Sequence, residues 1–158
     1  MSKEKVLAQL QAAVGGEETV GDWLLVDQAR INLFADATGD HQWIHVDPER
    51  AEKESPYQAA IAHGHLTLSL LPTLTQSVQG SGSQYEGVKL GVNYGLNRVR
   101  FPAPVKADSR VRARSRLKEV TEVQGGLQMI REVTVEVEGQ EKPACVAETI
   151  GMFFLNGS

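Results

Sequence analysis

The stretch of sequence that decides the fold is GHLTLSLLPTL, residues 64–74. Five leucines surround most of the girth of the predicted helix: Leu66, Leu68, Leu70, Leu71 and Leu74. A helix that is apolar on nearly all sides must be buried, so we expect it to lie against other elements. Pro72 lacks the N–H that a helix interior requires, and it predicts a kink or an early end there.

Downstream of this segment the hydrophobic period changes to two, as in β-strands. Residues 109–118 place four arginines on one face and Val111, Ala113, Ser115 and Leu117 on the other, and residues 131–138 place Glu132, Thr134 and Glu136 opposite three valines. The arginines could form a phosphate-binding stripe. We favour a solvated sheet face, because the glutamates can pair with the arginines across neighbouring strands.

Two further segments complete the predicted sheet. Residues 145–154 predict one strand, and residues 87–101 predict a long strand with irregularities at Gly91 and Gly95. Helices followed by antiparallel strands indicate an α+β fold, in which the apolar helix lies across the concave face of the sheet. We expect one domain over residues 1–158, extended by an N-terminal helix at about residues 3–13.

Between that helix and the apolar segment, capping residues mark further elements. Residues 23–26 predict a short strand, after which Asp27 can cap the N-terminus of a helix that Gly39 ends. Asp47 and Pro48 form an N-cap with a first-turn proline and predict another short helix. Asp40 and His45 would then lie in a loop held at both ends by helix caps.

Composition excludes several classes of function. The net charge of −4 gives no attraction to nucleic acid or to anionic lipid, and we expect neither as a partner. No stretch approaches the ~20 apolar residues of a membrane span. Cys145 is the only cysteine, so no intrachain disulfide can form, and the N-terminus lacks the apolar run of a secretion signal. We therefore expect a cytoplasmic protein. The glycine–serine patch at residues 80–83 is interpreted as a flexible connection.

All four histidines fall between His41 and His65, which suggests a reaction site. A carboxylate at Asp40 and an imidazole at His45 can share the work of moving a proton to or from water. The free N–H groups at the helix start near Gly64 could stabilise a developing enolate oxygen. Adding water to a double bond conjugated to a thioester needs these two functions and no metal or redox cofactor. The spacing equally fits a His45 that only bonds turn backbone.

Other chemistries find less support in the sequence. His41 and His45, with His63 and His65, could suggest zinc, but we do not expect the helix that would bring the first pair together. Ser69 and Cys145 lack the local motifs of nucleophiles. The glycine-rich patch lacks the ending of a phosphate-binding loop, so neither a metal nor a nucleotide cofactor is predicted.

The runs FADATGDHQWIHVDPERA, residues 34–51, and IAHGHLTLSL, residues 61–70, resemble the MaoC-like dehydratases, which include the (R)-specific enoyl-CoA hydratases. The run VRFPAPV, residues 99–105, is also similar to that family. Gln42 and Trp43 stand where Asn-Pro is common, as in a subgroup close to NodN-like and mycobacterial hydratase proteins. Gln42 can still donate an amide hydrogen bond to substrate.

The resemblance implies a hot-dog fold, an antiparallel sheet wrapped around one long helix, in a homodimer. It also implies that Asp40 and His45 activate water and that the Gly64 N–H forms the oxyanion site. The expected function is an (R)-specific enoyl-CoA hydratase, a cofactor-independent hydro-lyase that adds water reversibly to trans-2-enoyl thioesters.

Two alternatives remain open, a hot-dog acyl-CoA thioesterase and a noncatalytic acyl-thioester binding protein. The carrier could be coenzyme A or an acyl carrier protein. Lys89, Arg98 and Arg100 are candidate phosphate contacts, because they are cations near the region where the family binds its thioester carrier.

Overall fold

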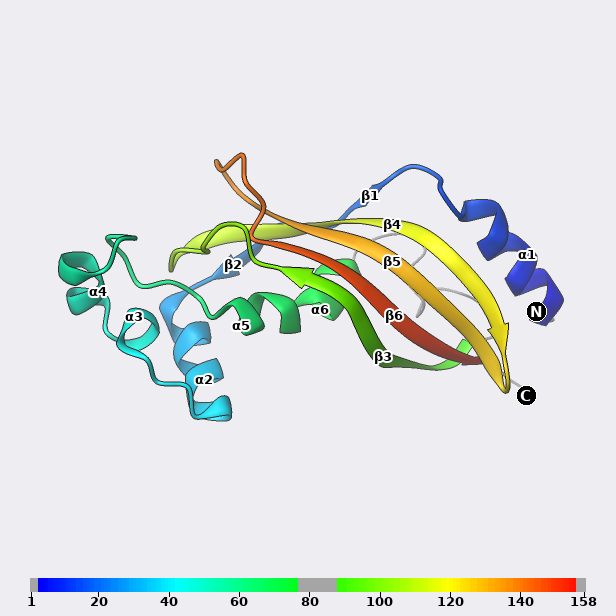
Figure 1. Cartoon of the computed structure of the whole chain (residues 1–158), viewed down its shortest axis with the longest axis horizontal. Coiled ribbons are helices and arrows are strands. Elements are labelled where there is room, and N and C mark those ends of the chain that lie inside the picture. The colour runs from blue at the N-terminus through cyan, green and yellow to red at the C-terminus, as the bar shows by residue number, and fades with distance from the viewer. Residues whose placement is uncertain (1–2, 77–87, 156–158) are drawn as a thin grey trace.

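A computed structural model describes residues 3–76 and 88–155 of the chain (Figure 1). The helices are α1 (Lys3–Ala13), α2 (Gln28–Thr38), α3 (Trp43–Val46), α4 (Pro48–Glu54), α5 (Gly64–Ser69) and α6 (Leu71–Gln76). The strands are β1 (Thr19–Val20), β2 (Leu24–Val26), β3 (Val88–Arg100), β4 (Ser109–Val123), β5 (Gly126–Val137) and β6 (Cys145–Leu155). The patch at residues 80–83 lies outside the described residues.

The strands form one antiparallel sheet in the order β1-β4-β5-β6-β3, with β2 also paired to β4. The predicted α+β class with an antiparallel sheet is confirmed. β3 forms one edge and shifts register against β6 three times, once between Asn93 and Gly95, where the sequence predicts an irregularity. Such shifts bend the strand, and Figure 1 shows the long strands strongly curved.

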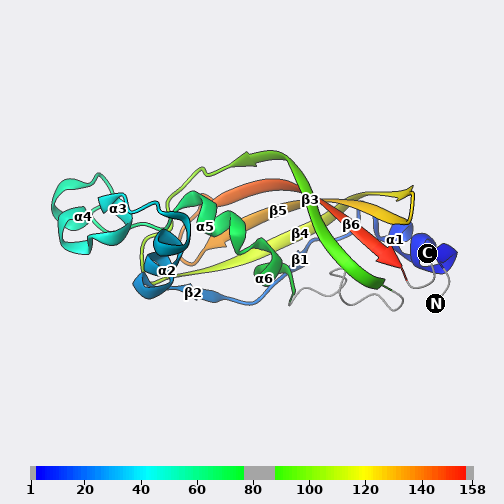
Figure 2. The ribbon, with the colours of Figure 1, turned by 90° about the horizontal axis from the view of Figure 1, so that it is seen from below.

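Helices α5 and α6 lie across the concave face of this sheet (Figure 2). Their leucines and alternate residues of β4, β5 and β6 make the main core: Leu66, Leu70, Leu71, Leu74, Val111, Ala113, Val133, Val135, Val137, Cys145 and Ala147. The break expected near Pro72 is confirmed, since α5 ends at Ser69 and α6 begins at Leu71. Two short helices therefore stand where the family resemblance implies one long helix.

The opposite face of the sheet carries paired charges. Glu136 on β5 accepts hydrogen bonds from Arg112 at 2.7 Å and Arg114 at 2.5 Å, and Lys118 on β4 pairs with Glu148 on β6. Partial burial would raise the pKa of Glu136, but hydrogen bonds from the two arginines outweigh it and lower that pKa. This pairing confirms the interpretation of the arginine stripe as a solvated sheet face.

A second cluster closes the far end of the sheet. Val6 and Leu10 of α1 pack on Leu117, Val120, Leu127, Met129 and Leu155. Helices α2, α3 and α4 lie at the opposite end of the molecule, beyond the end of the strands (Figures 1 and 2). None of the helices in the described ranges is long and apolar enough to cross a membrane.

Candidate active site

Asp40 is positioned by the end of helix α2. The Asp27 side chain caps the start of this helix by accepting a hydrogen bond from the Arg30 N–H, as predicted. Gly39 ends the helix with φ 78°, a left-handed conformation that glycine adopts without steric cost, and its N–H donates to the Ala35 carbonyl. The chain therefore leaves the helix at a fixed angle, with Asp40 as the next residue.

His45 lies on α3, a single helical turn, and not in the loop that the sequence suggests. Helix α4 begins as predicted, with Asp47 accepting from the Arg50 N–H and Pro48 in the first turn. The His45 side chain is 7% exposed, and its Nδ1 lies 2.7 Å from the Ile61 carbonyl oxygen. Because a carbonyl only accepts, Nδ1 carries the proton and Nε2 keeps a lone pair. His45 thus bonds backbone, as the alternative interpretation held, and still presents a free base.

His63 is the residue of this site whose role the sequence did not reveal. It is 3% exposed and stacks on His45, with ring centroids 3.8 Å apart and planes inclined by 24°. Its Nε2 lies 2.9 Å from the Asp40 backbone oxygen, so this nitrogen donates and the ring holds the Asp40 loop in place. The sequence Ala62-His63-Gly64 beside the predicted helix was a local signal for His63. Its contact with Asp40 spans 23 positions and could not be predicted from the sequence.

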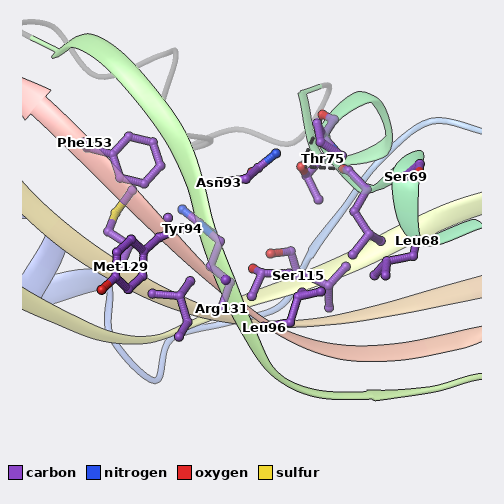
Figure 3. Close-up of a pocket in the computed structure, with 17 residues that line it drawn as sticks. Leu68, Ser69, Thr75, Asn93, Tyr94, Leu96, Ser115, Met129, Arg131 and Phe153 are labelled. Atoms are coloured by element: carbon purple, nitrogen blue, oxygen red, sulfur yellow. Dashed lines mark hydrogen bonds between the residues drawn. The ribbon is translucent and has the colours of Figure 1, made fainter. Parts of the chain in front are cut away.

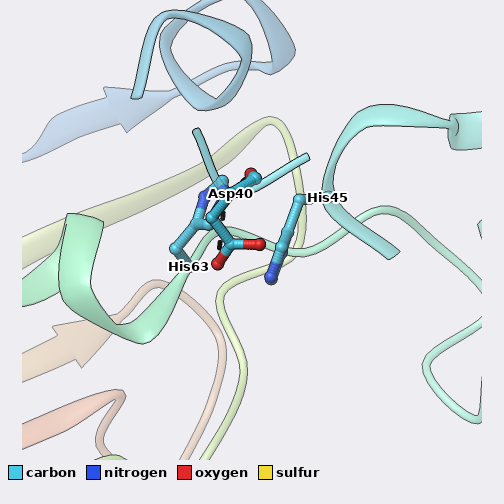
Figure 4. A group of neighbouring side chains, drawn as sticks. All are labelled: Asp40, His45 and His63. Atoms are coloured by element: carbon cyan, nitrogen blue, oxygen red, sulfur yellow. Dashed lines mark hydrogen bonds and ion pairs between the residues drawn. The ribbon is translucent and has the colours of Figure 1, made fainter. Parts of the chain in front are cut away.

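Asp40, His45 and His63 form one group (Figure 4). One oxygen of Asp40 and one nitrogen of each imidazole all lie within 4.8 Å of one another. The Asp40 side chain is 55% exposed, so the group is reached from solvent. A carboxylate and a neutral imidazole at this separation can hold one water molecule between them and exchange protons with it.

The same three residues could be considered as metal ligands. However, imidazole lone pairs lie in the ring planes, and two nearly parallel stacked rings direct them side by side and not at one point. One nitrogen of each ring is also committed to a backbone carbonyl. The geometry thus suits proton transfer better than metal binding, and the zinc pair His41–His45 does not form, because His41 bonds Asp36 instead.

Burial lowers the pKa of His45 below its ordinary value, and the neighbouring His63 ring lowers it further. The hydrogen bond to Ile61 and the charge of Asp40 act in the opposite direction but do not compensate. The His45 imidazole is therefore neutral at neutral pH, the form that can accept a proton from water.

Gly64 begins α5 immediately after His63 and lines a hollow of about 340 Å³ together with Thr67 and Phe101. No acceptor for its N–H is found among the described residues. A Cβ at position 64 would lie 2.9 Å from the Phe101 ring, so glycine permits this close packing. Gln42 precedes α3 with an exposed side chain, and its N–H bonds Asp40 Oδ1 at 3.3 Å.

The remaining candidates lie elsewhere. His65 is exposed, and the Ser69 hydroxyl donates to the His65 carbonyl. Cys145 is fully buried in the core, and burial raises its thiol pKa to about 11, so it is not a nucleophile at neutral pH. Lys89, Arg98 and Arg100 are exposed on β3, where their predicted contact with phosphate stays a prediction.

The chain is similar to known proteins over most of its length. The profile of the MaoC like domain matches residues 9–139. A Mycobacterium tuberculosis protein named 3-hydroxyacyl-thioester dehydratase Z is 54% identical over 145 residues, covering 91% of this chain and 93% of that protein. Nodulation protein N of Rhizobium leguminosarum bv. viciae is 47% identical over 149 residues, covering 93% and 90%. The (R)-hydratase from A. caviae involved in PHA biosynthesis has a similar fold, with a TM-score of 0.68, 22% identity and coverage of 86% and 93%.

Proposed function

This chain belongs to the MaoC-like dehydratase family, and from that premise we propose that it is an (R)-specific enoyl-CoA hydratase, a hydro-lyase acting on trans-2-enoyl thioesters. The dehydratase relative at 54% identity supports the reaction class. The observation that carries the proposal is the pairing of the Asp40 carboxylate with a His45 ring whose Nε2 is free to accept a proton.

In the proposed mechanism, Asp40 and His45 hold the attacking water. Its oxygen bonds C3 of the enoyl group while its proton passes through this pair to C2 on the same face, so the elements of water add syn. The thioester oxygen gains negative charge as the enolate develops, and the Gly64 N–H donates to it, a contact of a kind typically worth about 3 kcal/mol. Gln42 is proposed to donate an amide hydrogen bond to the substrate.

Replacement of the pair tests the proposal. Asp40→Asn and His45→Gln keep the size of each side chain but remove its ability to take a proton. We expect kcat for crotonyl-CoA to fall about 10²- to 10⁴-fold with little change in KM, because the lost interactions belong to the transition state. Loss of the conjugated enoyl absorbance measures hydration. Parent-like rates in both variants would show that the roles are assigned wrongly.

Two further measurements separate the alternatives. A thioesterase would release free thiol from saturated acyl-CoA, which a thiol reagent detects. A noncatalytic binding protein would be stabilised thermally by acyl-CoA without turnover.

We further propose that the chain acts as one MaoC-like domain, residues 1–158, in a homodimer. Support for the dimer comes from β3, whose outer edge pairs with no other described strand and exposes Leu90, Val92, Tyr94 and Leu96. Such an edge is a template for pairing with a second copy. A cytoplasmic location is also proposed, since the single cysteine allows no intrachain disulfide.

A further inference from the structure

A cavity of about 490 Å³ lies between helices α5 and α6 and the concave face of the sheet (Figure 3). Leu68, Leu71 and Pro72 border it from the helices, and Met129, Val133 and Phe153 border it from the strands. Most of its lining is therefore apolar, as expected for a site that receives a hydrocarbon chain.

One polar group in this cavity lacks a partner. Ser115 is 2% exposed and alternates along β4 with Ala113 and Leu117, so its side chain points to the concave face. Within residues 3–76 and 88–155, no group lies within hydrogen-bonding distance of its Oγ. A buried hydroxyl without a partner costs about 1–3 kcal/mol. A partner supplied by a bound molecule would remove that cost.

A cation lies on the same face. Arg131 is placed between the buried residues Met129 and Val133 in the alternation of β5, and Thr149 is its cross-strand neighbour on β6. Both Arg131 and Thr149 line the cavity. Arg131 already has an interaction partner, but a guanidinium has five N–H donors and can accept further oxygen ligands. The apolar cavity thus contains a hydroxyl and a guanidinium that can both donate hydrogen bonds to an oxygen atom of a ligand.

The cavity is also close to the proposed reaction site. Helix α5 begins at Gly64, and Leu68 lies one turn further along, at the border of the cavity. At 1.5 Å per residue, these positions are about 6 Å apart along the helix axis. A chain attached to a thioester held at Gly64 would have to follow α5 for about one turn to reach the cavity.

On the basis of the proposed function, we propose that this cavity binds the acyl tail of the substrate. Ser115 and Arg131 lie beside the apolar lining and select tails that bear a hydroxyl or a carboxylate over plain hydrocarbon tails. The shared chemistry is an oxygen atom on the tail that accepts hydrogen bonds. A carboxylate engages both residues, whereas a hydroxyl requires mainly Ser115.

The test compares hydration of crotonyl-CoA, trans-2-octenoyl-CoA and two octenoyl-CoA derivatives with a terminal hydroxyl or a terminal carboxylate. Ser115→Ala should lower kcat/KM about tenfold for the oxygenated substrates and leave crotonyl-CoA and octenoyl-CoA unchanged. Arg131→Met should lower kcat/KM for the carboxylate alone. Thr121→Ala is the matched control, because it removes a hydroxyl from the same strand at an exposed position that does not line the cavity.

Calorimetric binding of octanoyl-CoA and its terminal hydroxy and carboxy derivatives gives a second measurement that needs no turnover. Tighter binding of the oxygenated analogues, lost in Ser115→Ala, supports the inference even if hydration fails, in which case the proposed function alone is contradicted. Hydration with equal use of plain and oxygenated tails overturns the inference alone. An equal loss with crotonyl-CoA in Ser115→Ala also overturns it, because that substrate has no tail to reach Ser115.

Discussion

At the scale of single residues, His63 is a positioning residue that acts through its two neighbours. Its ring supports the face of His45, and its Nε2–H fixes the carbonyl of Asp40. Neither interaction involves the reacting atoms of the proposed mechanism, but each fixes the direction of a residue that the mechanism uses. Small displacements of such groups reduce the rate strongly, because the reacting atoms must be aligned.

The variant His63→Phe keeps a stacked ring and removes the hydrogen bond to Asp40. We expect kcat to fall about ten- to a hundredfold while KM changes little, since the proposed mechanism gives this ring no contact with the substrate. His63→Gln, which retains a donor, should recover part of the rate. His41→Phe is the matched control, because His41 is exposed and its ring bonds Asp36, away from His45 and His63. An unchanged kcat in His63→Phe would contradict the positioning role.

The pH dependence follows from the lowered pKa of His45. Its neutral form is the proposed base, and burial keeps that form populated below the ordinary value of 6.5. The value of kcat/KM should therefore decline at acidic pH with a midpoint below 6.5, in assays over a range of buffers. A midpoint at or above 6.5 would mean that another group controls the rate. His45 also lowers the stability of the folded chain as the pH falls from 6.5 to its native pKa, because only the unfolded chain binds the proton in that interval, and its contribution levels off below the native pKa.

The residues of the site differ in how far the sequence reveals them. Asp40 and His45 are adjacent to local signals, the Gly39 helix end and the Asp47–Pro48 cap, which the structure reproduces. The contact of His63 with Asp40 depends on how α5 packs beside α3, and no local pattern encodes that packing. The α3 turn itself was missed, because four residues are too few to show a helical period.

At the scale of elements, alternation in the strands predicts which side chains face the core, since the period of two survives in β4 and β5. The bulge after Leu117 in β4 is not visible in the sequence, because it is a mismatch between two strands. The break between α5 and α6 was predictable, because proline acts locally.

Helix α1 supports stability and not chemistry. Leu10 is 1% exposed in the cluster at the end of the sheet that lies opposite α2–α4. Leu10→Ala should lower the free energy of unfolding in urea by about 2–5 kcal/mol. Its kcat/KM for crotonyl-CoA at 25 °C should equal that of the parent. Leu33→Ala, at a position 70% exposed, should change neither quantity. A large loss of kcat/KM in folded Leu10→Ala would show that the two ends of the molecule are coupled.

At the scale of the whole molecule, the exposed edge of β3 predicts how two copies assemble. Val92 is 44% exposed on this edge and does not line the 490 Å³ cavity. A charge there should oppose pairing with a second copy, so Val92→Lys should elute as a monomer in size-exclusion chromatography with light scattering. Leu33→Lys places the same charge on α2 and should remain a dimer. A dimeric Val92→Lys would point to another surface.

The arrangement of the chain also has an evolutionary consequence. The groups that would handle water belong to a capped helical insert at one end of the molecule, whereas the side chains that border the cavity come mostly from strands and from α5 and α6. In the proposed assignment, mutations on the sheet can therefore change which acyl tails bind, while the residues proposed for proton transfer stay the same. Related proteins with this arrangement can evolve different substrate specificities while they keep the same reaction.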